Sequence, residues 1–529
     1  MVEQAPLQAS SKAAREFDEV FEHVNSFGRH QWILFVCFNL LVFPVSSQFS
    51  ALVFAFSAPA FHCTTANVTC PVKKCCDKCT SYAFDGPFHS SVSEWNLICD
   101  RAFLAAIVQS SYFVGMLIGS FVTGMMSDAW GRKKCIFLCN AIMLIFGVAS
   151  SFANNIILLA VLRFLVGFGL TGIMLALYIY SMELVGPSKR TAVGNLTYAF
   201  YNTFGILFVL FTYFLPDWRM LLLAITVPTV LLFPFWRMIP ESPRWLIAHN
   251  QLEEAHRELM LYGGKKDKPI DPNILKTLIE DIRKDQVLKE KRTKHYTPID
   301  LVRTPKLRKW TAIICYQWFV VAFVYFGIYL FLTQLAGNIY VNYTIMKSAT
   351  LLRVPATWLI YLKFGRRISY SFLIMSVGIT LLLVLAVHED VPLATTVLSL
   401  LGYIFIDCNW TGVYLITSEL FPTVLRNTAQ GTGSTSARLG GILSPYAAMM
   451  GQLPGLSIAF PVSIFGILAL LAGVLMYWLP ETLFSPMHQT IEAAEAAIDD
   501  YSIPCCKSPL QREEDVELAQ KTGEATSHL

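Results

Sequence analysis

Long apolar runs constrain this chain more than any other feature of its sequence. The first begins at Trp32, and a run of about 20 apolar residues is long enough to cross a bilayer as a helix. The composition agrees, because 15% of the 529 residues are charged, whereas soluble domains carry about 25%. We therefore expect an all-α membrane protein with twelve transmembrane helices. The expected spans are 32–56, 103–127, 135–153, 155–180, 191–213, 219–239, 309–333, 343–362, 368–387, 393–417, 427–450 and 457–479.

Lysine and arginine gather in every second loop between these spans. The loops at 131–134 and 363–367 are basic, whereas the loop at 151–155 has no lysine or arginine. Basic loops stay on the cytoplasmic side of a membrane, so we expect both termini to be cytoplasmic. Residues 1–31 are charged throughout and lack the short apolar core of a cleavable signal peptide. The first span should therefore be an uncleaved helix.

Short motifs of the first half recur in the second half after an interval of 234 to 240 residues. "DAWGRK" at 128–133 corresponds to "LKFGRR" at 362–367, and "PESPRWL" from Pro240 corresponds to "PETLFSP" from Pro480. A repeat of one orientation indicates two six-helix bundles with a substrate site between them, near the middle of the membrane. The expected division is a cytoplasmic N-terminus 1–31, an N-terminal bundle 32–240 with an external loop 57–102, a cytoplasmic linker 241–308, a C-terminal bundle 309–480 and a cytoplasmic tail 481–529.

The repeated motifs place charged residues at the cytoplasmic ends of the spans. Gly131 permits a tight turn there, and Asp128 and Arg132 flank it. Carboxylates and guanidiniums at one membrane depth can form bidentate pairs. Pairs that join the halves, and separate when the cytoplasmic side opens, would form a gate; the alternative is that they fix helix ends and set topology. The gating candidates are Asp128, Gly131, Arg132, Glu183, Arg190, Glu419 and Arg426.

The external loop 57–102 is rich in cysteine and contains a glycosylation motif. The sequence "NVT" makes Asn67 an acceptor in an external loop. Cysteines outside the membrane usually form disulfides, and six of them allow 15 pairings. A zinc site is the alternative, but His62 and His89 complete no usual ligand spacing, so we expect no metal. The disulfide candidates are Cys63, Cys70, Cys75, Cys76, Cys79 and Cys99.

An arginine stands in the middle of the eleventh span, in the stretch "GTGSTSARLGGILSP". An arginine such as Arg438 at the centre of a span costs about 2.5–3.5 kcal/mol on insertion scales, so it should face the interior with a partner. Arg353 lies inside the eighth span, and Asp407 is the acid deep in a span of the second half. One carboxylate cannot neutralise two guanidiniums, so the residual charge favours an anionic guest. The alternatives are that Arg438 pairs permanently with Asp407, and that Arg353 reaches the membrane edge.

Several motifs together resemble the major facilitator superfamily and, within it, the organic cation, anion and carnitine transporter family. The stretches that carry the resemblance are "NSFGRHQW", "SEWNLICDR", "GMMSDAWGRKK", "RFLVGFG", "PESPRWL" and "SELFPTVLRN". The resemblance covers nearly the whole chain and implies a secondary transporter that works by alternating access. One departure is Leu362, which stands where the first half has Asp128 and which should weaken that half of the gate.

The resemblance also implies residues of a substrate site. Organic-anion members have an arginine in the context of Arg438, as do carnitine-type members, and Arg353 replaces an acid that is common in cation members. Family motifs whose aromatic residues line the cavity are similar to stretches of this chain, and aromatic faces stack on planar anions. With Gln48 as a further polar candidate of the first span, the substrate-binding candidates are Arg438, Arg353, Tyr201, Trp318, Tyr325, Phe326 and Gln48.

These observations predict a plasma-membrane transporter of small organic anions that is embedded in the lipid bilayer. The sequence contains no phosphate-binding loop, metal-ligand cluster or pair of nucleophile and base, so we expect neither an enzyme nor a cofactor. The net charge of +4 is not clustered with aromatic residues, which argues against nucleic acid as a partner. Three alternatives remain open: a carnitine-like zwitterion or an organic cation as substrate, a counter-transported anion, and a sensor that binds without transport.

Overall fold

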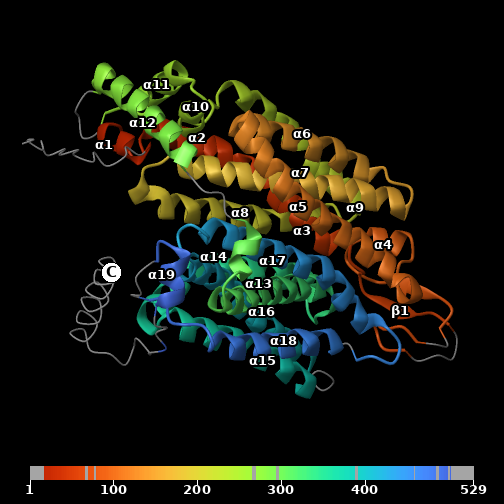
Figure 1. The fold of residues 1–529 in the computed structure, drawn as a ribbon. Coiled ribbons are helices and arrows are strands. Elements are labelled where there is room, and N and C mark those ends of the chain that lie inside the picture. The colour runs from red at the N-terminus through yellow and green to blue at the C-terminus, as the bar shows by residue number, and fades with distance from the viewer. Residues whose placement is uncertain are drawn as a thin grey trace, which may run out of the picture.

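The computed structural model describes residues 17–65, 70–76, 79–264, 270–292, 297–387, 391–457, 459–483, 488–497 and 501. Long helices make up most of the molecule (Figure 1). A two-stranded antiparallel sheet of β1 (Phe61–Cys63) and β2 (Tyr82–Phe84) lies in the loop that follows the first span. The prediction of an all-α membrane protein is confirmed.

The first half of the molecule is built from the first six spans. Its helices are α2 (Arg29–Leu40), α3 (Val42–Phe54), α5 (Ala102–Trp130), α6 (Arg132–Ser151), α7 (Ile156–Glu183), α8 (Arg190–Phe214), α9 (Trp218–Thr226) and the 3-10 helix η4 (Val227–Arg237). Two expected spans are not single α-helices. Pro44 has no N–H and its ring displaces the carbonyl of residue 40, so the first span divides at Leu41. Pro228 and Pro234 similarly end the regular helix of the sixth span.

The second half repeats this arrangement with the last six spans. Its helices are α13 (Pro305–Phe331), α14 (Ile339–Phe364), α15 (Arg366–Val387), α16 (Pro392–Leu420), α17 (Arg426–Met449) and α18 (Phe460–Met476), and the 3-10 helices η7 (Leu332–Gln334) and η8 (Met450–Gln452) follow α13 and α17. Glycines allow the closest contacts. A Cβ atom added to Gly440 of α17 would stand 2.5 Å from the carbonyl oxygen of Phe319 in α13. Small residues at such places let two membrane helices approach each other closely.

The short elements lie at the two ends of the bundle (Figure 1). One end, which we call the linker end, carries η1 (Phe17–Glu19), α1 (Val20–His23), α10 (Pro243–Ala248), α11 (Leu252–Met260), α12 (Pro272–Arg292), η6 (Pro298–Val302) and α19 (Ile491–Ala496). The opposite end, which we call the loop end, carries the β-strands, α4 (Ser91–Glu94) and η2 (Cys99–Arg101). Basic loops predict that the linker end faces the cytoplasm.

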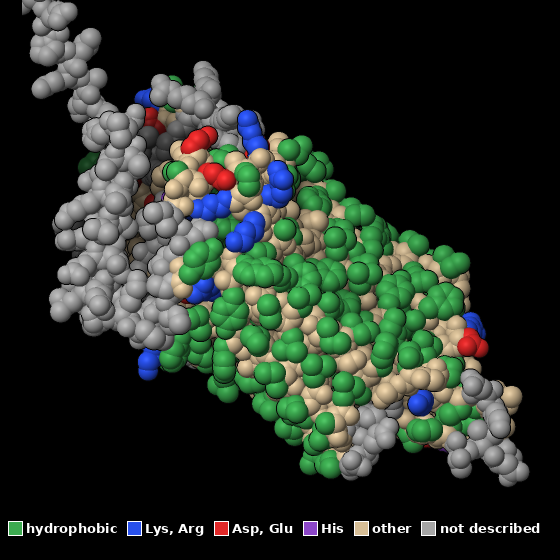
Figure 2. Space-filling view, turned by 60° about the horizontal axis from the view of Figure 1, so that its bottom comes forward, with side chains coloured by type: hydrophobic (Ala, Val, Ile, Leu, Met, Phe, Trp, Pro, Cys, Tyr) green, Lys and Arg blue, Asp and Glu red, His purple; other side chains and the backbone are tan. Residues whose placement is uncertain are grey.

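The surface of the molecule suits a lipid environment. Figure 2 shows a face covered by hydrophobic side chains, with charged side chains gathered towards its ends, and so large an apolar surface marks contact with a membrane or a partner. Nine helices among the described residues are long and apolar enough to cross a membrane. The other three of the twelve expected spans are α18, which has 17 residues, and the more polar α14 and α17.

The two halves contact each other through pairs of helices that the repeat relates. The most extensive of these contacts are between α5 and α17 and between α8 and α14. Because α14 is the counterpart of α5, and α17 the counterpart of α8, these two interfaces are the same contact made twice. This is the geometry expected for parallel repeats around an axis along the membrane normal.

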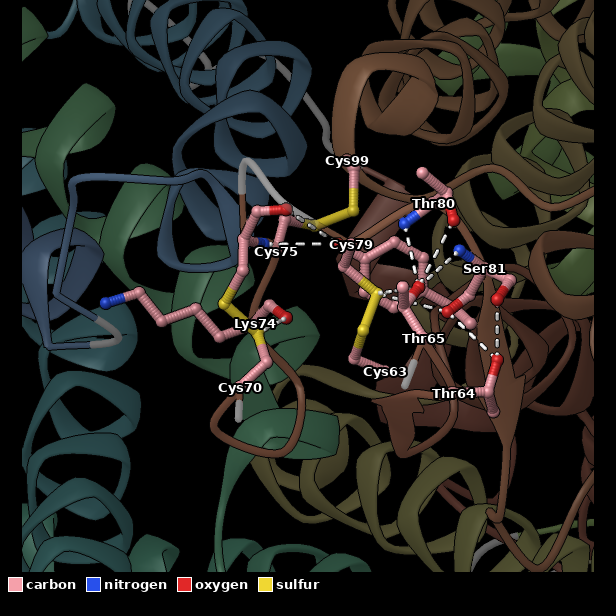
Figure 3. The surroundings of a disulfide bond; sticks show 12 residues. Cys63, Thr64, Thr65, Cys70, Lys74, Cys75, Cys79, Thr80, Ser81 and Cys99 are labelled. Carbon is pink, nitrogen blue, oxygen red and sulfur yellow. Dashed lines mark hydrogen bonds between the residues drawn. A yellow bond between two sulfur atoms is a disulfide. The ribbon is translucent and has the colours of Figure 1, made fainter. Parts of the chain in front are cut away.

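Disulfides fold the loop at the loop end. The six cysteines are joined as Cys63–Cys79, Cys70–Cys76 and Cys75–Cys99 (Figure 3). All six sulfur atoms are therefore engaged with one another, which leaves no thiolate for the alternative zinc site. A small apolar core that includes Phe61, Val92 and Leu97 packs beneath the disulfides. The expected glycosylation acceptor Asn67 lies outside the described residues.

Candidate functional site

Contacts that join the two halves lie at the loop end and at mid-depth. At the loop end, the ammonium of Lys73 donates to the carbonyl oxygen of Thr333 in the second half at 2.7 Å, and burial lowers the pKa of Lys73. Further in, the Tyr343 hydroxyl of α14 donates to Ser50 Oγ of α3 at 2.6 Å. The halves are thus closed against each other at the loop end.

An ion pair lies inside the second half at mid-depth. Arg353 of α14 donates from Nη1 to Oδ1 of Asp407 in α16 at 2.9 Å and to its carbonyl oxygen at 2.6 Å. The guanidinium carbon stands 4.6 Å from the ring centroid of Tyr198, in α8 of the first half. Arg353 is 8% exposed and Asp407 is 1% exposed. The alternative that Arg353 reaches the membrane edge is therefore wrong, because its guanidinium is buried against a carboxylate.

Arg438 lies in the middle of α17 and makes no ion pair with any described residue. Its Nη1 donates to the carbonyl oxygen and the hydroxyl of Ser434, one turn earlier in the same helix. Its Nε is buried without a hydrogen-bond partner. The alternative of a permanent pair with Asp407 is not what the structure contains, because Asp407 pairs with Arg353. Arg438 is thus an intramembrane guanidinium that keeps free donors and an uncompensated charge.

A lysine that sequence reasoning overlooked lies on the same helix as Arg353. Lys347 of α14 is 1% exposed and makes no ion pair or hydrogen bond with the described residues. Four aromatic rings surround its ammonium: Tyr329 at 5.2 Å, Tyr201 at 5.5 Å, Tyr343 at 5.6 Å and Phe49 at 6.0 Å to the ring centroids. The signal was present in the sequence, since Lys347 falls within the expected span 343–362.

Two aromatic candidates of the seventh span, Trp318 and Tyr325, lie against α16. Trp318 is fully buried, donates from Nε1 to Thr417 at 3.0 Å and contacts the Tyr414 ring at 4.4 Å. Tyr325 accepts a hydrogen bond from the Tyr403 hydroxyl at 2.9 Å. These two side chains are therefore held by partners of their own half. Sequence reasoning missed Tyr414, which is half-exposed beside Trp318.

Phe326 faces the first half. Its ring lies 4.9 Å from Phe113 of α5 and 5.7 Å from Phe49 of α3, between ring centroids. Both Phe113 and Phe326 lie against Gly441 of α17, where an added Cβ would come within 3.2 Å of each ring. Because residues three apart on a helix are neighbours, this aromatic contact lies one turn from Arg438.

The two candidates of the first half differ in what they face. Tyr201 of α8 stacks on Tyr198 and lies against Lys347, so it faces the second half. Gln48 instead is fully buried within its own half, where it accepts from Arg163 Nη1 at 2.8 Å and donates to Thr226 at 2.6 Å. Both ends of the Gln48 amide are thus occupied in this conformation, and its contact with a substrate is not supported.

Charged clusters at the linker end hold each half together internally. In the first half Arg132 donates from Nε to Glu183 at 3.3 Å and pairs with Asp128 at 3.0 Å. Glu241 accepts from the backbone N–H of Arg132 at 2.9 Å. Gly131 has φ +106°, and a Cβ there would stand 2.2 Å from the Glu241 carboxylate.

The remaining gating candidates also find partners that lie outside the opposite half. Arg190 pairs with Asp18 at 3.0 Å rather than with Glu183. In the second half Glu419 accepts from Arg366 Nε at 3.3 Å, and Arg426 contacts Thr423. In this conformation the pairs named here do not join the two bundles. The expectation that such pairs form across the halves when the linker end is closed stays a prediction.

The arrangement offers charge and aromatic surface rather than reactive groups. Arg438 and Lys347 present two cations without carboxylate partners, and the rings between them provide faces for an apolar body. Among the described residues, no group of three or more His, Cys, Asp or Glu side chains is placed to hold a metal ion. The site therefore suits reversible binding of an organic ion.

Comparison with known proteins agrees with this fold. The "Sugar (and other) transporter" family matches residues 61–494. A relative named "Organic cation transporter protein" from Drosophila melanogaster is 31% identical over 90% of this chain and 94% of its own length. "Organic cation/carnitine transporter 2" from Homo sapiens is 35% identical over 76% of this chain and 71% of its own length.

A third relative and a solved structure complete the comparison. "Solute carrier family 22 member 6-B" from Xenopus laevis is 29% identical over 96% of this chain and 97% of its own length. The inward open conformation of the xylose transporter XylE from E. coli superposes with a TM-score of 0.64, at 16% sequence identity, over 88% of this chain and 99% of that protein. At that identity the likeness concerns the fold alone.

Proposed function

Because this chain belongs to the organic cation, carnitine and anion transporter family of the major facilitator superfamily, we propose that it carries small organic anions across the plasma membrane by alternating access. Its relatives are transporters and not enzymes. In this proposal the termini and the linker face the cytoplasm, and the two bundles rock about a site between them. In this proposal the loop end, which is closed in this conformation, is the extracellular side.

The observation that carries the proposal is the uncompensated guanidinium of Arg438. The acid Asp407, deep in the second half, is occupied by Arg353, so it does not neutralise Arg438. An intramembrane charge that lacks a fixed partner is a candidate for contact with a charged substrate. A carboxylate or sulfonate would accept hydrogen bonds from the free edge of the guanidinium. In this proposal Arg353 neutralises Asp407, so that this carboxylate does not repel an anionic substrate.

A carnitine-like zwitterion is the second candidate substrate. The half-exposed Tyr414 ring lies among the aromatic residues beside α17, and aromatic faces bind quaternary ammonium groups. The human relative is named a cation and carnitine transporter. A substrate with both charges could place its carboxylate on Arg438 and its ammonium on these rings. A simple organic cation is less well accommodated, because it would meet two cations without an acid of its own.

The test is uptake of radiolabelled compounds into vesicles that contain the purified protein. We expect uptake of an aromatic carboxylate, and its loss by at least tenfold in Arg438→Asp, while Arg438→Lys keeps part of it. Tetraethylammonium and carnitine, each with and without sodium, are the comparison substrates. Anion uptake that survives Arg438→Asp contradicts the binding role, and binding without accumulation would indicate a sensor rather than a transporter.

A further inference from the structure

Lys347 is the buried cation for which the proposed function supplies no role. The residue is 1% exposed, and Asp407, the acid in the middle of the second half, interacts with it only through space because its hydrogen-bonded ion pair is with Arg353. Cation–ring contacts contribute about 2 kcal/mol or more when desolvated. A charge without a counter-ion in a membrane span is unfavourable by a similar or larger amount. The four rings around Lys347 therefore do not account for its presence in the way that a carboxylate would.

The rings around Lys347 come from both halves of the molecule. Phe49 of α3 and Tyr201 of α8 belong to the first half, whereas Tyr329 of α13 and Tyr343 of α14 belong to the second. We call these four side chains the aromatic cage. The hydrogen bond from Tyr343 to Ser50 closes the same interface at 2.6 Å. Separation of the halves at the loop end would withdraw two walls of the cage and expose the ammonium to that side.

Aromatic contacts connect the cage with the surroundings of Arg438. The Phe49 ring touches both Lys347 and Phe326, and Phe326 lies against Gly441, one turn from Arg438. Lys347 precedes Arg353 by six residues in α14, which places it about 9 Å nearer to the loop end along the helix. Lys347 lies eight residues from the loop-end start of α14 (347 − 339), and Arg438 lies eleven residues from the loop-end terminus of α17 (449 − 438), so a substrate that enters from the loop end would meet Lys347 first.

We propose that Lys347 is an entry site for the anionic group of the substrate, opened and closed by the aromatic cage during the transport cycle. This inference rests on the proposed function and names a second residue of its pathway. The ligand class is an organic anion with an aromatic or apolar body, because the cage offers one ammonium within a ring-lined wall. When the loop end is closed, as in this structure, the four rings cover the ammonium.

The first experiment compares Lys347→Met, Lys347→Gln and Lys347→Arg in the uptake assay with the aromatic carboxylate. Methionine preserves the length and bulk of the side chain, so a purely structural role predicts uptake like that of the wild type. We expect KM to rise at least tenfold in the two uncharged variants and less than threefold in Lys347→Arg. Lys363→Gln, on the same helix at the linker end, is the matched control. A wild-type KM in Lys347→Met overturns the proposal.

The second experiment tests the cage with a thiol in place of the ammonium. In Lys347→Cys, a membrane-impermeant methanethiosulfonate reagent added at the loop end should label the thiol, and the aromatic carboxylate should slow labelling at least threefold. Absence of labelling during active transport overturns the entry role. Failure of the wild type to transport any anion would instead refute the proposed function, whereas normal uptake by Lys347→Met with loss in Arg438→Asp would refute this inference alone.

Discussion

The two halves carry nearly the same charged cluster at the linker end, and the clusters differ at one residue position. In the first half Arg132 donates to Glu183 at 3.3 Å, and in the second half Arg366 donates to Glu419 at the same distance. Each arginine also has its backbone N–H capped by a glutamate that follows the last span of the half. These caps are Glu241, at 2.9 Å, and Glu481, at 2.8 Å.

The difference is the second acid of each cluster. Asp128 pairs with Arg132 at 3.0 Å, whereas the equivalent position of the second half is Leu362. The carboxylate of Asp128 is 74% exposed, so its ion pair adds little stability in this conformation. We infer that the shared part of the cluster holds each bundle together, and that the unshared acid serves the movement of one bundle against the other.

We expect the largest loss of stability from substitutions that break the shared arginine–glutamate ion pair of each half. Glu419→Gln leaves the poorly exposed Arg366 without the carboxylate with which it pairs. This should lower the free energy of unfolding by about 3 kcal/mol. Glu183→Gln should cost less, because Arg132 retains Asp128. The measurement is the thermal unfolding midpoint of each purified variant in detergent, with the exposed Glu492→Gln as control. Equal losses in the two variants would mean that Asp128 contributes nothing to its cluster.

The sequence predicts those features of the fold that depend on neighbouring residues along the chain. Apolar length and basic loops are local properties, so the twelve spans could be predicted, and the recurrence of Gly131 as Gly365 revealed the repeat. The breaks at Leu41 and within the sixth span were missed because a hydropathy count ignores what proline does to a helix. Pro44 and Pro228 carried that signal.

The site was less predictable, because its contacts depend on how helices pack. The sequence showed that the spans of the second half contain one deep carboxylate and two arginines. Only the packing of α14 against α16 decides that Asp407 pairs with Arg353. Gln48 was expected near the substrate, whereas it binds Arg163. The sequence placed Lys347 within an expected span, but it did not show the aromatic surroundings of this lysine, because the four rings come from four different helices and no local motif brings them together.

Substitution of the glycines in the turns beside the charged clusters should lower the free energy of unfolding by about 1–3 kcal/mol. Gly131 has φ +106° and Gly365 has φ +86°, a region that residues other than glycine adopt only with strain. We expect Gly131→Ala and Gly365→Ala to lower the thermal unfolding midpoint by similar amounts, measured as above. Gly431→Ala is the control, since open space surrounds that glycine. A loss in one half alone would show that the repeated turns are not equivalent.

We expect the smallest change in free energy at the position where the two clusters differ, which is Asp128 in the first half and Leu362 in the second. We expect that closure of the linker end would extend the interface of α5 with α17 to that end and bring Asp128 towards the N-terminus of α17 and Arg426. An acid near a helix N-terminus contributes about 0.3–1 kcal/mol. The equivalent contact, of Leu362 with the start of α8, has no charge. Asp128→Leu should therefore shift the resting population about two- to fivefold towards the conformation that is open at the linker end.

The reciprocal substitution places an acid at the equivalent position of the second half. Leu362→Asp should give the second half its missing acid, favour closure of the linker end by a similar factor, and restore the balance in the double variant with Asp128→Leu. The readout is the labelling rate of a cysteine at Gly431, in the open space at the linker-side half of α17, by a thiol reagent added from the linker end. Unchanged rates in both single variants would leave Asp128 as a surface charge, since only a group that contacts the other half in one state can bias the two states.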